Sequence, residues 1–166
     1  MPKTREKREI VRLGGKLKEI ITVRDKEGKI IHRIISPLMI EFKLKDVLQV
    51  IIGATILAVP VAFTEEVWLL GETLPILNIG TFLFLSVLFI GTFDYYNFYR
   101  NRIEKHWQEF VKRVFFTYIF SFIVVGIILY LIQKTPWNTD WLLAVKRIII
   151  VTFPSSMSAA IADTIK

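Results

Sequence analysis

Long apolar runs, separated by short charged or turn-forming segments, fill most of the chain after residue 45. The four runs cover approximately residues 47–70, 76–96, 113–132 and 146–165. A membrane hydrocarbon core about 30 Å thick requires roughly 20 helical residues at about 1.5 Å each, and every run supplies that length. The pattern therefore predicts four transmembrane helices.

The first 45 residues have a different pattern. The segment IITVRDKEGKIIHRII, residues 20–35, places two runs rich in β-branched residues on either side of a loop with Gly28, which predicts a β-hairpin. The segment IEFKLK, residues 40–45, alternates apolar and charged residues and predicts a third short strand. Residues 1–18 are highly charged, and we expect them to be loose or helical.

Together these patterns predict an all-α polytopic membrane protein with a small basic appendage. We expect residues 46–166 to form a four-helix transmembrane domain, and residues 1–45 to form a cytoplasmic N-terminal segment that contains the β-hairpin. A domain of about 40 residues with so little core is rarely stable alone. We therefore expect this segment to pack on membrane-facing loops or on a second copy of itself.

The composition supports membrane insertion and indicates an orientation. Hydrophobic side chains make up 53% of the chain, and the mean hydropathy is +0.48. Of the 22 lysines and arginines, 19 precede the first span, lie between residues 99 and 113, or end the chain at Lys166. Because basic loops stay on the cytoplasmic side, we expect a multi-pass plasma-membrane protein with both termini cytoplasmic. The net charge of +7 is then a topological signal, and we expect no nucleic-acid partner.

Several kinds of chemistry are missing from the sequence. There is no cysteine, which excludes disulfides, thiolate metal sites and cysteine nucleophiles. No His-Glu zinc motif, glycine-rich phosphate loop or Ser-His-Asp set is present. We therefore expect neither an enzyme nor a bound cofactor.

The first and last predicted spans have two sequence features in common. Each contains a proline, Pro60 or Pro154, which removes a backbone donor and is expected to break or hinge its helix. Each also carries a stripe of small residues that lets another helix approach closely, and Ala54, Ala58 and Ala62 form this stripe in the first span.

Hydroxyl groups in the last two spans are candidates for a polar lining. A role in helix packing is the alternative interpretation, since such hydroxyls also bond to helix carbonyls. These residues are Thr117, Ser121, Ser155 and Ser156.

Acidic residues lie near the ends of the predicted spans. Glu65 and Glu66 are at the outer end of the first span, and Asp94 and Asp163 lie near the cytoplasmic boundary. An ionised carboxylate at membrane depth is costly unless it lines water, pairs or binds an ion. Each of these residues is therefore either an interfacial side chain or a cation ligand, and Glu65 with Glu66 is the candidate metal-cation site.

Two basic residues bear on this outer acidic pair. If the last span begins before Lys146 and Arg147, both lie within reach of Glu65 or Glu66 for an ion pair. If it begins after them, they lie on the outer surface. An ion pair would neutralise the acidic site and weaken the case for a cation path.

Three blocks of the sequence resemble a known family. They are Asp46 to Gln49, Pro60 to Trp68 with Gly71 to Pro75, and Pro154 to Asp163. Over residues 36–166 the chain is similar to a family of archaeal and bacterial integral membrane proteins catalogued as a domain of unknown function. The resemblance implies a polytopic membrane protein and brings no activity or site residue with it.

Two functional hypotheses follow. The favoured one is a cation-conducting channel or transporter that acts as a homo-oligomer in the lipid bilayer, with inorganic cations as partners. Its path would be lined by Glu65, Glu66, Asp94 and Asp163. The alternative is a membrane-anchored interaction or sensor protein that works through its basic N-terminal segment without transport. A folded, partner-binding domain in residues 1–45 would favour the alternative.

Overall fold

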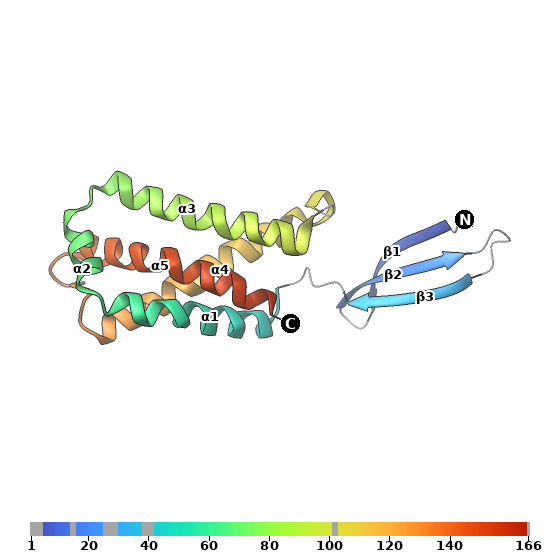
Figure 1. Ribbon diagram of the computed structural model, residues 1–166, viewed down its shortest axis with the longest axis horizontal. Coiled ribbons are helices and arrows are strands. Elements are labelled where there is room, and N and C mark those ends of the chain that lie inside the picture. Colours follow the sequence, from blue (N-terminus) through green and yellow to red (C-terminus); the bar gives the residue numbers. More distant parts are fainter. Residues whose placement is uncertain (1–4, 14–15, 25–29, 38–41, 101–102, 166) are drawn as a thin grey trace. The chain divides into compact units, whose positions relative to one another are not determined.

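The computed structural model describes residues 5–13, 16–24, 30–37, 42–100 and 103–165. It divides into two compact units, residues 1–41 and 42–166, and each is described by itself. In the part of the chain that the structure describes, the first unit is a β-sheet and the second is a bundle of helices (Figure 1).

The described strands of the first unit form an antiparallel sheet in the order β1-β2-β3. Ile20 of the central strand pairs with Ile35 of β3, and the register shifts between Val23 and Arg24. The predicted hairpin is confirmed, although its loop lies outside the described residues. The strands are β1 (Arg5–Leu13), β2 (Lys16–Arg24) and β3 (Ile30–Pro37).

Two expectations for this unit were wrong. Residues 1–18, which we expected to be loose or helical, contain β1 and the start of β2. β1 forms backbone hydrogen bonds with the edge of β2 that β3 leaves open. Gly14 and Gly15 separate these strands in the sequence, a hairpin signal that we missed. The third strand expected at residues 40–45 is absent from its described part, since Leu44 and Lys45 begin the first helix.

The helices of the second unit confirm the predicted fold class. Among the described residues, four segments are long and apolar enough to cross a membrane: Leu44–Ala62, Ile76–Tyr99, His106–Leu131 and Trp141–Thr164. The elements are α1 (Leu44–Ala62), α2 (Glu65–Thr73), α3 (Ile76–Asp94), the π-helical turn η1 (Tyr95–Tyr99), α4 (Ile103–Leu131) and α5 (Trp141–Thr164).

The first predicted span is divided into two helices. α1 ends at Ala62, two residues after Pro60, and α2 begins after Thr64, whose backbone is extended. Pro60 has no N–H to bond within the helix, which favours an end near this point. Consequently, Glu65 and Glu66 lie in α2 and not in the helix that crosses the bundle.

α5 is the central helix of the bundle. It packs against α1, α2, α3 and α4, and it lies between α1 and α3 in Figure 1. Within the 18-residue apolar stretch of α5, 56% of the residues are buried inside the bundle. The corresponding stretches of the other three spans have 17–28% of their residues buried. The first and last spans therefore face each other within one chain.

The small-residue stripes lie where α1 and α5 meet. Ala54, Ala58 and Ala62 are fully buried, as the stripe predicts. The approach is close at Gly53, where a Cβ added to the glycine would lie 2.9 Å from the Ala159 Cα. Close backbone approach explains why small residues occur on both helices.

α5 continues through Pro154 as one helix from Trp141 to Thr164, so the expected break is not present there. The hydroxyl of Thr152 donates to the Ile148 carbonyl at 2.7 Å, and that of Ser155 donates to the Val151 carbonyl at 2.7 Å. These bonds flank the carbonyl that the proline leaves without its helical donor. A hinge role for Pro60 and Pro154 stays a prediction.

Candidate functional site

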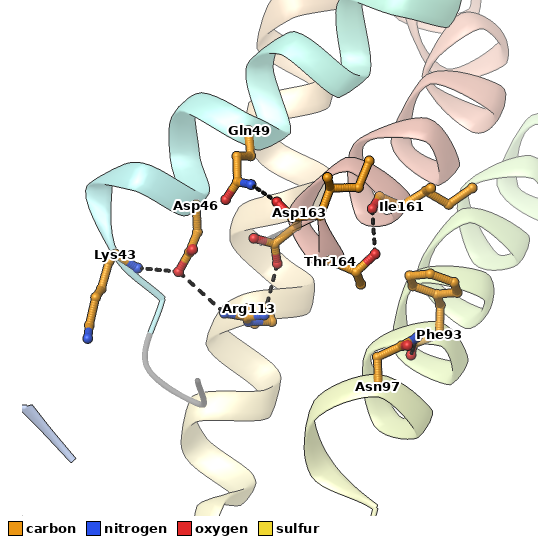
Figure 2. Close-up of polar contacts among 10 residues, drawn as sticks. Lys43, Asp46, Gln49, Phe93, Asn97, Arg113, Ile161, Asp163 and Thr164 are labelled. Atoms are coloured by element: carbon orange, nitrogen blue, oxygen red, sulfur yellow. Dashed lines mark hydrogen bonds and ion pairs between the residues drawn. The ribbon is translucent and has the colours of Figure 1, made fainter. Parts of the chain in front are cut away.

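A fully buried arginine lies at the end of the bundle where α1 begins and α5 ends. We call this the Asp163 end, and the opposite end, where α2 lies, the α2 end (Figure 1). Arg113 comes from α4 and is 0% exposed. Its Nη1 is 2.9 Å from Asp163 Oδ2, and its Nη2 is 3.4 Å from Asp46 Oδ2 (Figure 2). One guanidinium therefore joins α1, α4 and α5.

Both carboxylates are held in place by their helix ends. Asp46 is in the first turn of α1 and accepts a hydrogen bond from the backbone N–H of Lys43 at 2.9 Å, so it caps the helix as well as binding Arg113. Asp163 is in the last turn of α5, and the side chain of Gln49 donates to the Ile165 carbonyl just beyond it. The start of α1 and the end of α5 are thereby fixed against each other.

Aromatic rings enclose the same guanidinium. The Arg113 Cζ atom is 3.9 Å from the centroid of the Phe98 ring and 5.7 Å from that of Phe42. Ring faces attract cations, most strongly where water is excluded. The rings keep water from the ion pairs and so strengthen their electrostatic interactions.

A third carboxylate, Asp94, is buried beside this arrangement at the end of α3. It is 1% exposed and lies within electrostatic range of Arg113 and Asp163. Within the described part of the chain, neither of its carboxylate oxygens has a hydrogen-bond partner. The π-helical turn η1 begins at the next residue, and such turns often occur at functional sites.

We refer to Asp46, Asp94, Arg113 and Asp163 as the Arg113 cluster. It brings together both acids that the sequence placed near one membrane boundary, Asp94 and Asp163. Among the described residues, Asp46 and Asp163 pair with one buried guanidinium, and the buried Asp94 carboxylate lies within electrostatic range of it. If all are ionised, the cluster carries excess negative charge in a site closed to solvent.

Buried hydroxyls continue from this cluster toward the middle of the bundle. Thr117 lies one turn after Arg113 on α4, and its hydroxyl has no hydrogen-bond partner among the described residues. Ser121 donates to the Thr117 carbonyl at 2.7 Å, and Ser156 donates to the Phe153 carbonyl at 3.1 Å. With Ser155, the predicted polar side chains are all buried inside the bundle, mostly bonded to their own helices.

The other two predicted acids lie at the opposite end. Glu65 and Glu66 are exposed in the first turn of α2, away from the Arg113 cluster. Arg147 instead pairs with Glu72, with 2.7 Å between Nη2 and Oε1. Lys146 donates to the Leu74 carbonyl at 2.7 Å. Both basic residues thus contact other groups of the α2 end.

The sequence did not identify Arg113 or Asp46 as members of a site. Arg113 stood at the edge of a predicted span, where a basic residue is ordinary, and Asp46 was noted only as part of a block that resembles the family. A signal was present, because Arg113, Thr117 and Ser121 follow one another at four-residue spacing on one helix face. No group of three or more His, Cys, Asp or Glu side chains in the described residues is arranged to hold a metal ion.

Comparison with known proteins gives a family. No curated protein and no solved structure matches the chain. Residues 19–165 match the family described as "Putative integral membrane protein (DUF2391)". The match begins within β2, earlier than the resemblance at residues 36–166, and extends through all the helices. With its four long apolar helices, the chain belongs to this family of integral membrane proteins.

Proposed function

We propose that this protein moves cations across the membrane, as a channel or a transporter, and that the Arg113 cluster is a cation-binding part of the path. The observation that supports this most is the excess of buried carboxylates over buried guanidinium among the described residues of the cluster. Asp46 and Asp163 are sufficient to join α1, α4 and α5 through Arg113, so the buried Asp94 exceeds what a structural contact needs.

The energetic cost of the cluster supports a functional role. A charged side chain at the centre of a membrane helix costs about 2.5–3.5 kcal/mol or more, and a charge that is buried away from water near a helix end is also costly, so membrane helices rarely keep such groups without use. Asp94 adds a carboxylate that the ion pairs of Arg113 with Asp46 and Asp163 do not require. An incoming cation would offset its charge.

The interior beyond the cluster is consistent with a path that is closed in this conformation. The buried hydroxyls of Thr117 and Ser121 lie on the Asp163 side of an apolar cluster that includes Val67, Leu129 and Ile148. Passage would require the helices to move apart at this apolar layer. Pro60 and Pro154 are the proposed hinges, and Glu65 with Glu66 would attract cations to the α2 end.

Orientation and assembly complete the proposal. We infer a plasma-membrane protein with both termini cytoplasmic, which places the Arg113 cluster near the cytoplasm and Glu65 with Glu66 outside. Because the chain has no cysteine, Ser36→Cys and Asn138→Cys can each be labelled alone in intact cells. An impermeant maleimide should label only Asn138→Cys. Labelling of Ser36→Cys alone would show that the orientation in the membrane is the opposite one.

We also propose that the protein is a homo-oligomer, and native mass spectrometry would count its subunits.

The test of transport is ion flux into liposomes that contain the full-length protein. Potassium, sodium, calcium and protons are offered in turn to wild type, Asp94→Asn and Asp163→Asn, with Glu65→Gln/Glu66→Gln as an exposed-site control. We expect flux of at least one cation that falls in both aspartate variants and falls less in the control. Absence of flux of every ion above empty liposomes would refute the proposal.

A second function is favoured by the first unit. The described strands of residues 5–37 form a sheet in a compact unit of their own, as an interaction or sensor domain would. Isoleucines of β3 are more than 40% exposed and could contact a partner: Ile30, Ile31, Ile34 and Ile35. Under this proposal the helices anchor the sheet. Removing residues 1–41 should then abolish co-purification of a partner, whereas a transporter lacking them would keep its flux.

A further inference from the structure

The space between two of the clustered carboxylates is already occupied by a cation of the protein itself. Arg113 places Nη1 against Asp163 and Nη2 against Asp46, so each of these acids faces a fixed positive charge. A metal ion bound between them would have to displace a guanidinium that two aromatic rings also enclose. These two acids are therefore poorly arranged to receive an inorganic ion.

Asp94 is different from both. It is buried and has no hydrogen-bond partner within the described residues, and Ile90, one turn earlier on α3, belongs to an apolar cluster with Val114 and Tyr118. A metal cation that leaves water needs several oxygen ligands to replace its hydration shell. A proton needs one, because it forms a covalent O–H bond to a single carboxylate oxygen.

We propose that the cation exchanged at the Arg113 cluster is a proton and that Asp94 is the residue that binds and releases it. This inference rests on the proposed transport function and names its ion. Chains of carboxylates are the usual proton carriers inside membrane proteins.

The charged groups around Asp94 determine what happens when it binds a proton and when it releases one. It lies within electrostatic range of Arg113 from α4, Asp163 from α5 and Tyr99 from η1. When Asp94 holds the proton on one oxygen it is neutral, and Arg113 remains with Asp163 and Asp46. When the cluster opens to solvent and the O–H bond breaks, a water molecule takes the proton and both electrons of the bond stay on the carboxylate. The new negative charge attracts Arg113 and competes with its two present partners.

This competition couples proton release to helix contacts. Arg113 joins α4 to the start of α1 through Asp46 and to the end of α5 through Asp163. A shift of the guanidinium toward Asp94 would weaken both joints and strengthen a contact with α3. Proton release at Asp94 would therefore loosen the contacts that hold the start of α1 and the end of α5 to α4.

The first experiment compares proton flux in liposomes among wild type, Asp94→Asn and Asp94→Glu, all full length. Asparagine keeps the shape of aspartate and cannot bind the proton, whereas glutamate keeps the carboxylate. A pH-sensitive dye inside the liposomes follows protons, and sodium and potassium indicators follow other cations in parallel. We expect wild-type proton flux, flux at the level of empty liposomes for Asp94→Asn, and partial recovery for Asp94→Glu.

A second measurement does not depend on transport. Infrared difference spectra between alkaline buffer and a mildly acidic buffer in which exposed carboxyl groups stay ionised should show a protonated-carboxyl C=O band in wild type that disappears in Asp94→Asn. The same elution volume and melting temperature for the variants would establish that all are folded.

The outcomes separate the two proposals. Sodium or potassium flux in wild type with no proton flux, or proton flux equal in wild type and Asp94→Asn, overturns the inference about Asp94 and leaves cation transport standing. No flux of any ion overturns transport and this inference with it. A carboxyl band that remains in Asp94→Asn also overturns the assignment.

Discussion

The two ends of the helical unit each bury an arginine, and the two arginines have different partners. Arg113 is fully buried and contacts two carboxylates, with a third nearby. Arg147 is 8% exposed and donates to the backbone carbonyls of Trp68 and Lys134, at 3.3 and 2.8 Å, as well as to Glu72. The Glu72 side chain is 52% exposed.

This difference separates a structural contact from a candidate site. Around Arg147, two neutral carbonyls and one half-exposed acid contact one positive charge, and the described residues there include no buried carboxylate in excess. Lys134 also lies over the Trp68 ring, 3.7 Å from its centroid, so that several contacts hold α2 to the loop before α5. Around Arg113, acids are in excess and water is excluded. The contacts of Arg147 therefore explain how α2 is held, and the proposed ion chemistry concerns the Asp163 end alone.

The largest effect is expected at Arg113. Arg113→Met would leave Asp46 and Asp163 buried without their cation, which typically costs about 3–5 kcal/mol in free energy of unfolding. Denaturation followed by tryptophan fluorescence in detergent would measure this cost. Arg113→Lys should recover part of it, because a lysine keeps the charge but cannot bond two acids in the same geometry. If Arg113→Met were as stable as wild type, Asp46 and Asp163 would have to be protonated and uncharged in the folded protein.

The next effect tests the close contact beside that cluster. A Cβ on Gly53 would lie 2.5 Å from the Ala162 Cβ and 2.9 Å from the Ser158 carbonyl oxygen. Gly53→Ala should therefore separate α1 from α5 and cost about 1–3 kcal/mol in the same assay. Gly80→Ala is the matched control, because nothing lies within 4 Å of the position that its Cβ would take. Equal stabilities of the two variants would contradict so close an approach of the two helices.

Arg147→Met should cost less than Arg113→Met. It removes donors from two carbonyls and from Glu72, but these partly buried groups can bond water instead, so we expect about 1–2 kcal/mol. Cation flux should persist once the folded fraction is matched, since this arginine is outside the proposed site. A loss of flux as large as that of Asp94→Asn would show that the two ends are not separate in function.

The smallest effects are expected at the exposed acids of α2. Glu72→Gln weakens one half-exposed ion pair and should cost at most about 1 kcal/mol. Glu65→Gln/Glu66→Gln alters two exposed side chains and should change stability by less than about 0.5 kcal/mol. Both variants would be compared in the same denaturation assay. A large loss in the double variant would indicate contacts that a second copy of the chain supplies.

Some features followed directly from local sequence. Segments 44–62 and 76–99 are apolar over about the length that a bilayer requires, and membrane insertion depends on this local property. The hairpin of β2 and β3 was found because alternation and a glycine-containing loop are also local signals. Asp94 and Asp163 were identified for a similar reason, since an acid beside a long apolar run is visible without a structure.

Only the tertiary structure decided which acids share a site. Arg113 and Asp46 are 67 residues apart, and their contact depends on how α1 and α4 are rotated about their axes. Hydropathy does not report rotation, because a helix apolar on every face gives no preferred side. The central place of α5 was undetermined for the same reason. The sequence by itself thus determined that helices cross the membrane and that acids lie near their ends. Packing between distant helices determined that two of those acids, Asp94 and Asp163, lie with Asp46 around one arginine.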